Sequence, residues 1–334
     1  MRSKMSYRSL VILLLFGLCF AAFLSILVGR YALSVHEVIT AFSQLPHIDT
    51  SQQASVLFTI RLPRIIASML VGLGLAVAGA TFQAVLNNPL ASPDVLGTSS
   101  AAGFGAALGM LVAAQSLLLI TLSSFVFGLL SLGLVYGLCA FKKKHDTLSI
   151  LLAGIIVTSL FMALTSAIKF VADPNDTLPE ITFWLMGSFS NVSFSELYWV
   201  TPLFLSGYCL LHLLRFKMNI LSLGDEEAIL SGINPKRLRI LLLTISAILV
   251  SASVTIAGVI GWVGLVIPHL VRSIVGYNHG KLIPVSALIG ALFLLVVDNL
   301  ARSISAAEIP IGILTSLIGA PLFALLFIRS ENHD

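Results

Sequence analysis

Ten runs of mostly apolar residues follow one another along the chain, and they constrain its fold more than any other feature. The runs are Leu10–Val28, Ile65–Leu86, Val95–Val112, Leu117–Ala140, Leu148–Ile168, Leu197–Leu214, Ile240–Ile260, Trp262–Val275, Leu282–Val297 and Ile309–Ile328. A helix needs roughly 20 apolar residues to cross the hydrocarbon core of a bilayer. With 57% hydrophobic and 10% charged residues, the chain has too little polar surface to cover a water-soluble globule. We therefore predict an all-α polytopic membrane protein of about ten transmembrane helices, forming a single domain over residues 1–334.

The lysine and arginine residues indicate how these helices are oriented, because such residues favour cytoplasmic loops. With the N-terminus inside, only five of the 19 fall on the outer side, namely Arg30, Arg61, Arg64, Lys169 and Arg302. We therefore predict a multi-pass protein of the bacterial inner membrane with both termini in the cytoplasm. The first run is longer than the apolar core of a signal peptide, so we expect an uncleaved span. Membrane topology explains the net charge of +4, and no nucleic-acid partner is indicated.

Motifs for nucleotide, cofactor or metal binding are missing from the sequence. No Gly-x4-Gly-Lys-Ser/Thr phosphate loop occurs, so any dependence on ATP requires a partner. The three cysteines lie inside apolar runs without a Cys-x-x-Cys pair, which favours buried thiols over a disulfide or metal site. Gly72-Leu-Gly74 lies within a span rather than in a strand–turn–helix unit, so we expect close helix packing there instead of dinucleotide binding.

Ionisable residues are nearly absent from the centres of the runs, whereas ion-coupled transporters usually place an acidic residue or histidine there. His269 is the one candidate at depth. Because it follows Pro268, we expect its ring to satisfy carbonyls freed by a helix kink. The pattern therefore weakens the case for an ion-coupled transporter or a membrane-embedded enzyme.

Two further patterns concern the organisation of the chain. The longest cytoplasmic loop, residues 216–239, reads as two short helices broken at Gly232 and Pro235. Equal spacings also relate two parts of the chain, since a proline and a glycine follow both Gly79 and Gly258 by ten and eighteen residues. In the predicted topology the two parts run in opposite directions, which is typical of an inverted repeat.

Four motifs are spread over nearly the whole chain. They are Arg61-Leu-Pro-Arg64, Asn88-Pro-Leu-Ala-Ser-Pro-Asp-Val-Leu-Gly97, Gly261-Trp-Val-Gly-Leu-Val-Ile-Pro-His-Leu-Val-Arg272, and Ala307-Glu-Ile-Pro-Ile-Gly-Ile-Leu-Thr-Ser-Leu-Ile-Gly-Ala-Pro321. In sequence and in order, these motifs resemble the FecCD family of permeases. Such permeases serve importers of ferric siderophores, haem and cobalamin. The resemblance implies a cobalamin-permease-like dimer of ten-helix subunits, capped inside by two ATP-binding-cassette ATPase subunits and served outside by a substrate-binding protein.

The resemblance also implies roles for particular residues. The cytoplasmic coupling segment that seats in the ATPase corresponds to Leu223, Gly224, Asp225, Glu226, Glu227, Ala228 and Gly232. Docking of the binding protein corresponds to Arg61, Arg64 and Arg302, whose planar groups suit carboxylates. Structural or gating motifs correspond to Asn88, Pro89, Gly97, Gly264, Pro268, His269, Arg272, Glu308 and Pro310. Alternatively, the acidic residues form a solvated turn and the arginines anchor a helix end.

The function that we expect is a permease subunit, not itself an enzyme, that moves a ferric siderophore or similar iron chelate inward. Haem, cobalamin or a metal oxyanion are alternative cargoes on the same architecture. Neither a cofactor nor a metal site is expected in this chain. Whether the second permease subunit is a copy of this chain or a sister protein stays open.

Overall fold

The computed structural model describes residues 6–29, 31, 33–43, 52–113, 116–141, 147–305 and 307–330. In this part of the chain all regular elements are helices, and there is no strand. They are α1 (Tyr7–Leu27), α2 (Val35–Ser43), α3 (Gln52–Ser55), the π-helix η2 (Val56–Arg61), α4 (Leu62–Val85), the 3₁₀-helix η3 (Pro93–Leu96), α5 (Thr98–Ala113), α6 (Leu117–Phe141), α7 (Thr147–Val171), α8 (Thr177–Leu185), α9 (Phe194–Leu213), α10 (Arg215–Leu221), α11 (Asp225–Leu230), α12 (Pro235–Ala257), α13 (Val263–Val275), α14 (His279–Ser303) and α15 (Ile311–Ser330).

Each of the ten predicted apolar runs coincides with a helix. Among the described residues, six continuous helical stretches are long and apolar enough to cross a membrane, and α9 with α10 forms a seventh candidate that bends by 56°. Three shorter apolar helices, α5, α13 and α15, account for the other runs. The prediction of an all-helical, multi-pass membrane protein is therefore confirmed.

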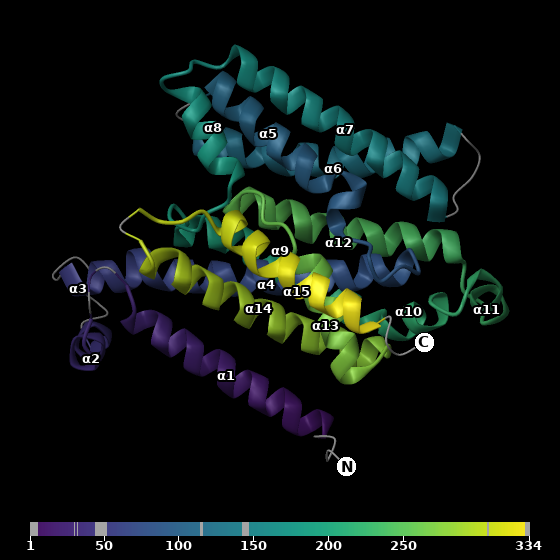
Figure 1. Ribbon diagram of the computed structural model, residues 1–334, viewed down its shortest axis with the longest axis horizontal. Helices are drawn as coiled ribbons and strands as arrows, with labels where there is room; N and C mark the ends of the chain where they lie inside the picture. The colour runs from purple at the N-terminus through teal and green to yellow at the C-terminus, as the bar shows by residue number, and fades with distance from the viewer. Residues whose placement is uncertain are drawn as a thin grey trace.

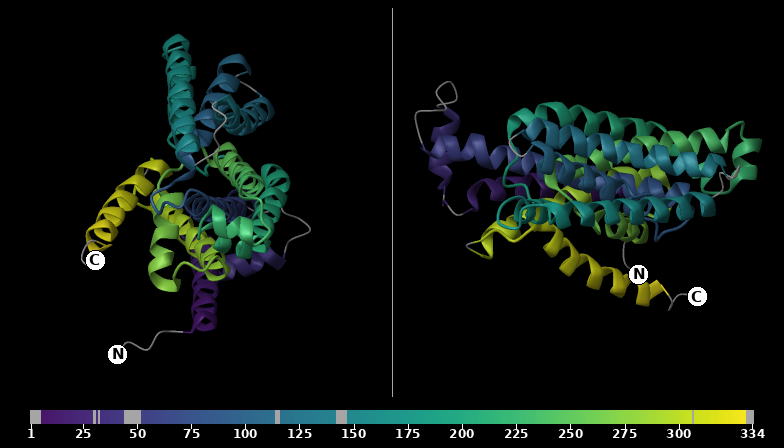
Figure 2. Two further views of the ribbon diagram at one scale, coloured as in Figure 1. Left: turned by 90° about the vertical axis from the view of Figure 1, so that its right-hand side faces the viewer. Right: turned by 90° about the horizontal axis from the view of Figure 1, so that it is seen from above.

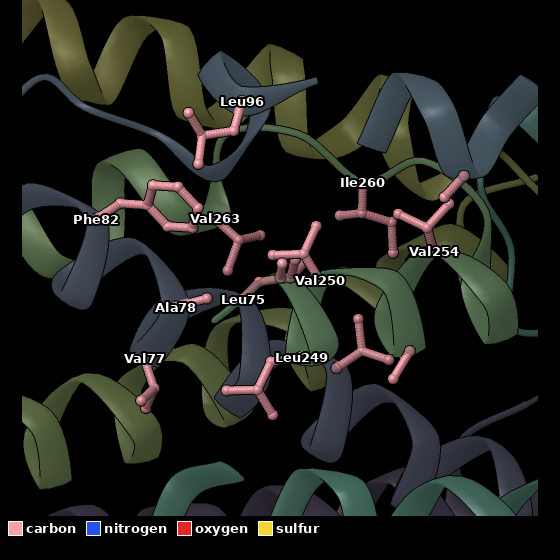
Figure 3. Packing of buried hydrophobic residues seen from close by; sticks show 14 of the residues in the cluster. Leu75, Val77, Ala78, Phe82, Leu96, Leu249, Val250, Val254, Ile260 and Val263 are labelled. Carbon is pink, nitrogen blue, oxygen red and sulfur yellow. The ribbon is translucent and has the colours of Figure 1, made fainter. Parts of the chain in front are cut away.

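Helix α4 forms the centre of the molecule, because other helices surround it. Of its most apolar stretch, 78% of the residues are buried, against 11% for α1. Leu75, Ala78 and Phe82 of α4 lie with α12 side chains such as Val250 in the core shown in Figure 3. Because nearly every side of α4 meets protein, its sequence carries small residues where a peripheral helix carries bulky ones.

Glycines let neighbouring helices touch α4 backbone to backbone. A methyl group added at Gly72 would collide with the carbonyl of Gly290 on α14, and one at Gly79 would collide with that of Gly264 on α13. Close approach of this kind is the usual role of small residues between membrane helices. The glycines of the Gly72-Leu-Gly74 pair therefore pack helices, as predicted from their position inside a span.

The remaining helices lie around this centre. Helices α5, α6 and α7 form a group on one side of α12, and α1 packs mainly on α14 at the opposite edge (Figure 1). Viewed along the bundle, α1, α7 and α15 stand at the periphery (Figure 2). Their exposed residues are mostly large and apolar, which suits contact with lipid or with another apolar surface.

The two ends of the bundle differ in what they carry. The start of α1 and the end of α15 lie at the same end as α10 and α11 (Figure 1). Helices α2, α3 and α8 lie at the other end, with the link between α14 and α15. This agrees with an even number of crossings, and we name the two ends after the roles expected from the sequence, the coupling end and the outer end.

The glycines and prolines that suggested a repeat do not occupy matching local structures. Gly79 lies inside α4, whereas Gly258 ends α12 with a φ of +69°. Pro89 lies between helices, whereas Pro268 lies inside α13. Only Gly97 and Gly276 agree, since both adopt a positive φ after a helix.

Candidate coupling and docking sites

The predicted coupling segment forms two short helices, but their boundaries differ from those expected. The break falls at Ser222–Gly224, between α10 and α11, and Gly224 has a φ of +132°. Gly232 ends α11, and Pro235 is the first residue of α12 rather than a second break. The side chain of Asn234 accepts a hydrogen bond from the Arg237 N–H, which caps α12. Helix α12 therefore starts earlier than the predicted span Ile240–Ile260.

Gly232 ends α11 through a specific pair of backbone hydrogen bonds. The Ile233 N–H donates to the Ala228 carbonyl at 2.8 Å, and the Gly232 N–H donates to the Ile229 carbonyl at 2.9 Å. This pattern requires the left-handed conformation, and Gly232 supplies it with a φ of +74°. The sequence position of Gly232 thus fixes where α11 stops.

The surface of α11 combines free acidic groups with exposed apolar ones. Glu226 and Glu227 are exposed, and neither forms an ion pair among the described residues. Leu223, Ile229 and Leu230 are 71%, 62% and 88% exposed. An apolar patch with charged neighbours at the end of a membrane protein is typical of a protein contact site.

Two members of the predicted coupling set are engaged within the chain. Ala228 is fully buried, so it supports α11 from within and does not face a partner as we had predicted. Asp225 accepts hydrogen bonds from both terminal nitrogens of Arg239, at 2.5 and 2.9 Å. This pair ties α11 to α12 and leaves Glu226 and Glu227 as the unpaired acids.

At the outer end, all three predicted docking arginines are buried, although docking would require exposed groups. Arg61, Arg64 and Arg302 are 3%, 5% and 6% exposed. The guanidinium group of Arg61 donates to the carbonyls of Ile26 and Tyr31. The sequence alone did not indicate this burial, because each arginine lies just outside a predicted apolar run, where water contact is the usual outcome.

Arg64 is bound by two carboxylates that lie far from it in sequence. Its Nε lies 2.9 and 3.1 Å from the two oxygens of Asp298 on α14, and its Nη1 lies 3.0 and 2.9 Å from those of Glu308. The side chain of Asp298 is fully buried, whereas that of Glu308 is 29% exposed. Asp298 thus meets two nitrogens of the guanidinium, Nε and Nη2, whereas Glu308 meets Nη1 alone with both of its oxygens.

Arg302 completes the cluster on the side of α1. Its Nη2 donates to the carbonyl and the hydroxyl of Ser25, both at 2.7 Å, and also contacts the side-chain oxygen of Asn299. Its Nε lies 3.9 Å from Asp298. We define the arginine cluster as Arg61, Arg64, Arg302, Asp298 and Glu308. It joins α1, η2, α4, α14 and the α14–α15 link at one point.

The Asn88–Gly97 motif shapes a turn that inserts against α7. The Asn88 side chain accepts a hydrogen bond from the Leu90 N–H at 2.9 Å, and Pro89 lies between them. Gly97 ends η3 with a φ of +72°, and a methyl group there would lie 2.9 Å from the Thr158 nitrogen on α7. The motif therefore connects the end of α4 to the middle of α7.

The motif around α13 has mainly packing contacts. Gly264 meets Pro93 of η3, since an added methyl group would lie 2.8 Å from its Cδ. The ring of His269 packs edge-on against Phe323 at 5.9 Å, and its Nδ1 has no hydrogen bond within the described residues. Nδ1 therefore does not bind the carbonyls freed at Pro268, although we had expected one of the ring nitrogens to do so. Arg272 lies over the ring of Tyr277 at 6.0 Å.

Pro310 lies where the α14–α15 link enters α15, two residues after Glu308. Its carbonyl accepts a hydrogen bond from the Ile313 N–H at 3.1 Å, which begins the helix. The first two residues of α15 bond to the residues that follow α8. Ile311 donates its N–H to the Gly187 carbonyl and Gly312 donates to the Met186 carbonyl, both at 2.9 Å. The link therefore connects the arginine cluster to α8.

A cavity of about 280 Å³ opens between α5, α7, α8 and residue 259 near the outer end. Its polar lining comes from Ser100, Thr165, Ser166 and Lys169, with apolar groups around them. Lys169 is the charged residue among those lining it, and no acidic group belongs to the lining. Such a surface suits brief contact with an anion.

Comparison with known proteins agrees with this architecture. Residues 15–329 match the FecCD transport family. The chain is 42% identical to the molybdate import system permease protein MolB of Haemophilus influenzae, over 98% of this chain and 97% of the relative. It is 37% identical to the Fe(3+)-citrate import system permease protein YfmE of Bacillus subtilis, over 91% and 90%.

A solved structure is also similar throughout. It is an ABC transporter of the metal-chelate type in an inward-facing conformation, with a TM-score of 0.87 and 42% sequence identity, covering 96% of this chain and 98% of the other. Together with the helical architecture and the motif segments, these similarities show that the chain belongs to the FecCD transport family and is a permease of an ATP-binding-cassette importer.

Proposed function

We propose that this permease carries an anionic metal compound inward across the bacterial cytoplasmic membrane. The observation that carries the proposal is the cavity beside α7, whose lining offers the ammonium of Lys169 without any carboxylate, while the hydroxyls of Thr165 and Ser166 donate to carbonyls of α7. A single cation on an otherwise uncharged wall attracts an anion without holding it tightly, and a transport pathway must release its cargo.

Two cargoes fit this charge. An oxyanion of the molybdate class is supported by the relative named for molybdate, which aligns over 98% of the chain. A ferric chelate, the cargo expected from the motifs, is supported by the relative named for ferric citrate. The higher identity and longer alignment favour the oxyanion as the first candidate.

Measurements of uptake by cells test the role of the Lys169 charge and distinguish the two candidate cargoes. A strain lacking the gene would carry the wild-type permease, Lys169→Glu or Lys169→Arg, and accumulation of labelled molybdate and of labelled ferric citrate would be measured in each. We expect accumulation of one anion to fall about tenfold or more with Lys169→Glu and to persist with Lys169→Arg. Equal uptake by all three forms would refute the proposed role of the cavity.

We further propose that the exposed face of α11 contacts the ATPase partner. Hydrolysis of ATP belongs to that partner in this family. Glu226 and Glu227 supply unpaired charge, and Leu223, Ile229 and Leu230 supply apolar area beside it. Movement of the partner on hydrolysis would then be passed to α10 and α12, which flank α11 in the chain.

The outer end is proposed as the docking face for a substrate-binding protein. The arginine cluster holds three cations and two carboxylates, and although the arginines are buried, they line a cavity through which an acidic side chain of the partner could reach this excess positive charge. This assignment places the coupling end in the cytoplasm, with the start of α1 and the end of α15 on that side. A single-cysteine label at Leu230 that reacts only after the membrane is opened would support this orientation, and reaction from the outside of intact cells would contradict it.

We also propose that a second permease subunit covers the peripheral apolar faces of α7 and α15. Met162 of α7 is 59% exposed and Leu317 of α15 is 67% exposed. Neither residue meets the α4 core. A tagged copy that purifies with an untagged copy would support a homodimer, and its failure to do so would favour a sister subunit.

A further inference from the structure

Glu308 differs from the other members of the arginine cluster, because it lies on a link between helices and reaches water. Asp298 is fully buried on α14, whereas the Glu308 side chain is 29% exposed. Both carboxylates bind the same guanidinium, that of Arg64. If one of them leaves Arg64, it is Glu308, since returning this side chain to water costs less than moving a charge buried within a helix.

The cluster has space for another anion beside Glu308. A cavity of about 210 Å³ is lined by all three arginines and by Glu308, with Tyr31 and Ile60 at its edge. Arg61 forms hydrogen bonds to carbonyl groups and has no carboxylate partner among the described residues. The cavity therefore exposes more positive than negative charge to any acidic group that reaches it.

We propose that Glu308 is a placeholder for an acidic side chain of the docking substrate-binding protein, which displaces Glu308 from Arg64 when it binds. This inference rests on the proposed docking at the outer end. One carboxylate replaces another at Nη1 of Arg64, so the exchange keeps the buried guanidinium paired with two carboxylates. Asp298 stays in place and holds Arg64 in position.

Displacement of Glu308 has a mechanical consequence, because the α14–α15 link is fixed at few points. Within residues 307–310, Ile309 donates to the Ala301 carbonyl at 3.1 Å, and Glu308 supplies the ion pair. The link then continues into the hydrogen bonds from Ile311 and Gly312 to the end of α8. Docking would thus release the link next to α8, which borders the cavity that holds Lys169.

The test compares matched losses of one negative charge at the outer end. Wild-type permease, Glu308→Gln and Glu180→Gln would be placed in nanodiscs, and binding of the purified substrate-binding protein encoded with the permease would be measured by biolayer interferometry. Glu180 is exposed on α8 and lies outside the arginine cluster, so its variant reports the general effect of charge. We expect Glu308→Gln to lower the dissociation constant about threefold or more relative to Glu180→Gln, because the internal competitor is gone.

A second measurement follows the link itself. A cysteine at Ala307, which is exposed, would be labelled in the absence and presence of the binding protein, in a variant without the native cysteines. We expect docking to increase the labelling rate in wild-type Glu308 and to change it less in Glu308→Gln, where the link is already free. If docking slows labelling of the Ala307→Cys variant equally in both forms, the proposal is overturned.

The outcomes separate this inference from the docking proposal on which it rests. If the binding protein binds, but Glu308→Gln and Glu180→Gln have the same affinity, docking stands and the placeholder role fails. Weaker binding by Glu308→Gln would also overturn it, since Glu308 would then contribute to the interface directly. Binding by none of the three forms would overturn docking at this face altogether.

Discussion

The two ends of the bundle use charge in opposite ways. At the outer end, Arg64 and Arg302 are buried and bound to groups of the same chain, with Asp298 between them. At the coupling end, Glu226 and Glu227 are exposed without ion pairs in the described structure. Buried paired charges stabilise an arrangement only while both partners are present, whereas exposed ones are available to another protein. Charged residues at the outer end therefore hold the fold together and can meet a partner only by exchanging an existing contact, whereas those on α11 can meet a partner directly.

The largest effect on stability is expected at the buried arginine cluster of the outer end. Asp298→Asn removes the carboxylate shared by Arg64 and Arg302 and leaves two buried cations short of a partner. We expect a loss of about 3–5 kcal/mol in stability, seen as a large drop in monodisperse protein on size-exclusion chromatography and in Tm. Asp176→Asn is the control, because Asp176 is exposed and its side chain does not cap α8. If both variants behave like wild type, the cluster does not stabilise the fold.

The second effect addresses recognition at the coupling end. Glu226→Arg together with Glu227→Arg should leave insertion and Tm unchanged, because both side chains are exposed. Cargo uptake and the amount of ATPase that purifies with the permease should fall about tenfold or more, since the reversed charge would repel the surface of the ATPase that contacts α11. The double change to Gln is the neutral control and should give an intermediate loss. Unchanged uptake and unchanged ATPase recovery would mean that these acids form only a solvated turn.

A smaller effect is expected from the apolar part of the same surface. Leu230 is 88% exposed, so Leu230→Ser removes apolar area that the chain itself does not cover. We expect ATPase affinity to fall by a few-fold, about 1 kcal/mol, with no loss of Tm. Leu221→Ser, at a fully buried position of α10, should instead lower Tm. A lower Tm for Leu230→Ser would show that the residue packs within the permease.

The smallest effect concerns the one described ion pair at the coupling end. Arg239→Met separates Asp225 from α12, but Asp225 is 49% exposed and water replaces much of the lost interaction. We expect the local stability of α11 to fall by about 0.5–1 kcal/mol, which would appear as faster hydrogen exchange over Asp225–Leu230. Arg237→Met is the control, since Arg237 has no described ion pair. Faster exchange throughout α12 would mean that the pair supports more than α11.

Local patterns predicted the helices and a loop with two short helices over residues 216–239, but they could not predict the arginine cluster. Apolar run length is a local property, and Gly232 carries its own conformational signal in the sequence. Arg64, in contrast, meets Asp298 and Glu308 across 234 and 244 positions. No residue near Arg64 in the sequence indicates that two distant acidic side chains bind it. The available clue was Asp298 itself, because an acidic residue next to a long apolar run needs a partner.

The break between α10 and α11 was missed for a different reason. We read Gly232 and Pro235 as the interruptions because glycine and proline are the strongest local signals. Gly224 carries the same signal, and with a φ of +132° it is the residue that separates the two helices. Local signals could not rank Gly224, Gly232 and Pro235 as breaks. The start of α11 at Asp225 is also held by Arg239 of α12, and this contact between helices is not visible in the local sequence.

The burial of α4 also has a consequence for how the chain is made. Its neighbours α12, α13 and α14 are synthesised long after it, since residue 235 follows residue 85 by 150 positions. At about 5–20 residues per second, α4 waits in the membrane for roughly 8–30 seconds with its glycine-lined surface facing lipid or the translocation machinery. A chain truncated before α12 would leave the faces of α4 that meet α12, α13 and α14 uncovered, and membrane quality-control proteases would meet a permease whose central helix lacks these three neighbours.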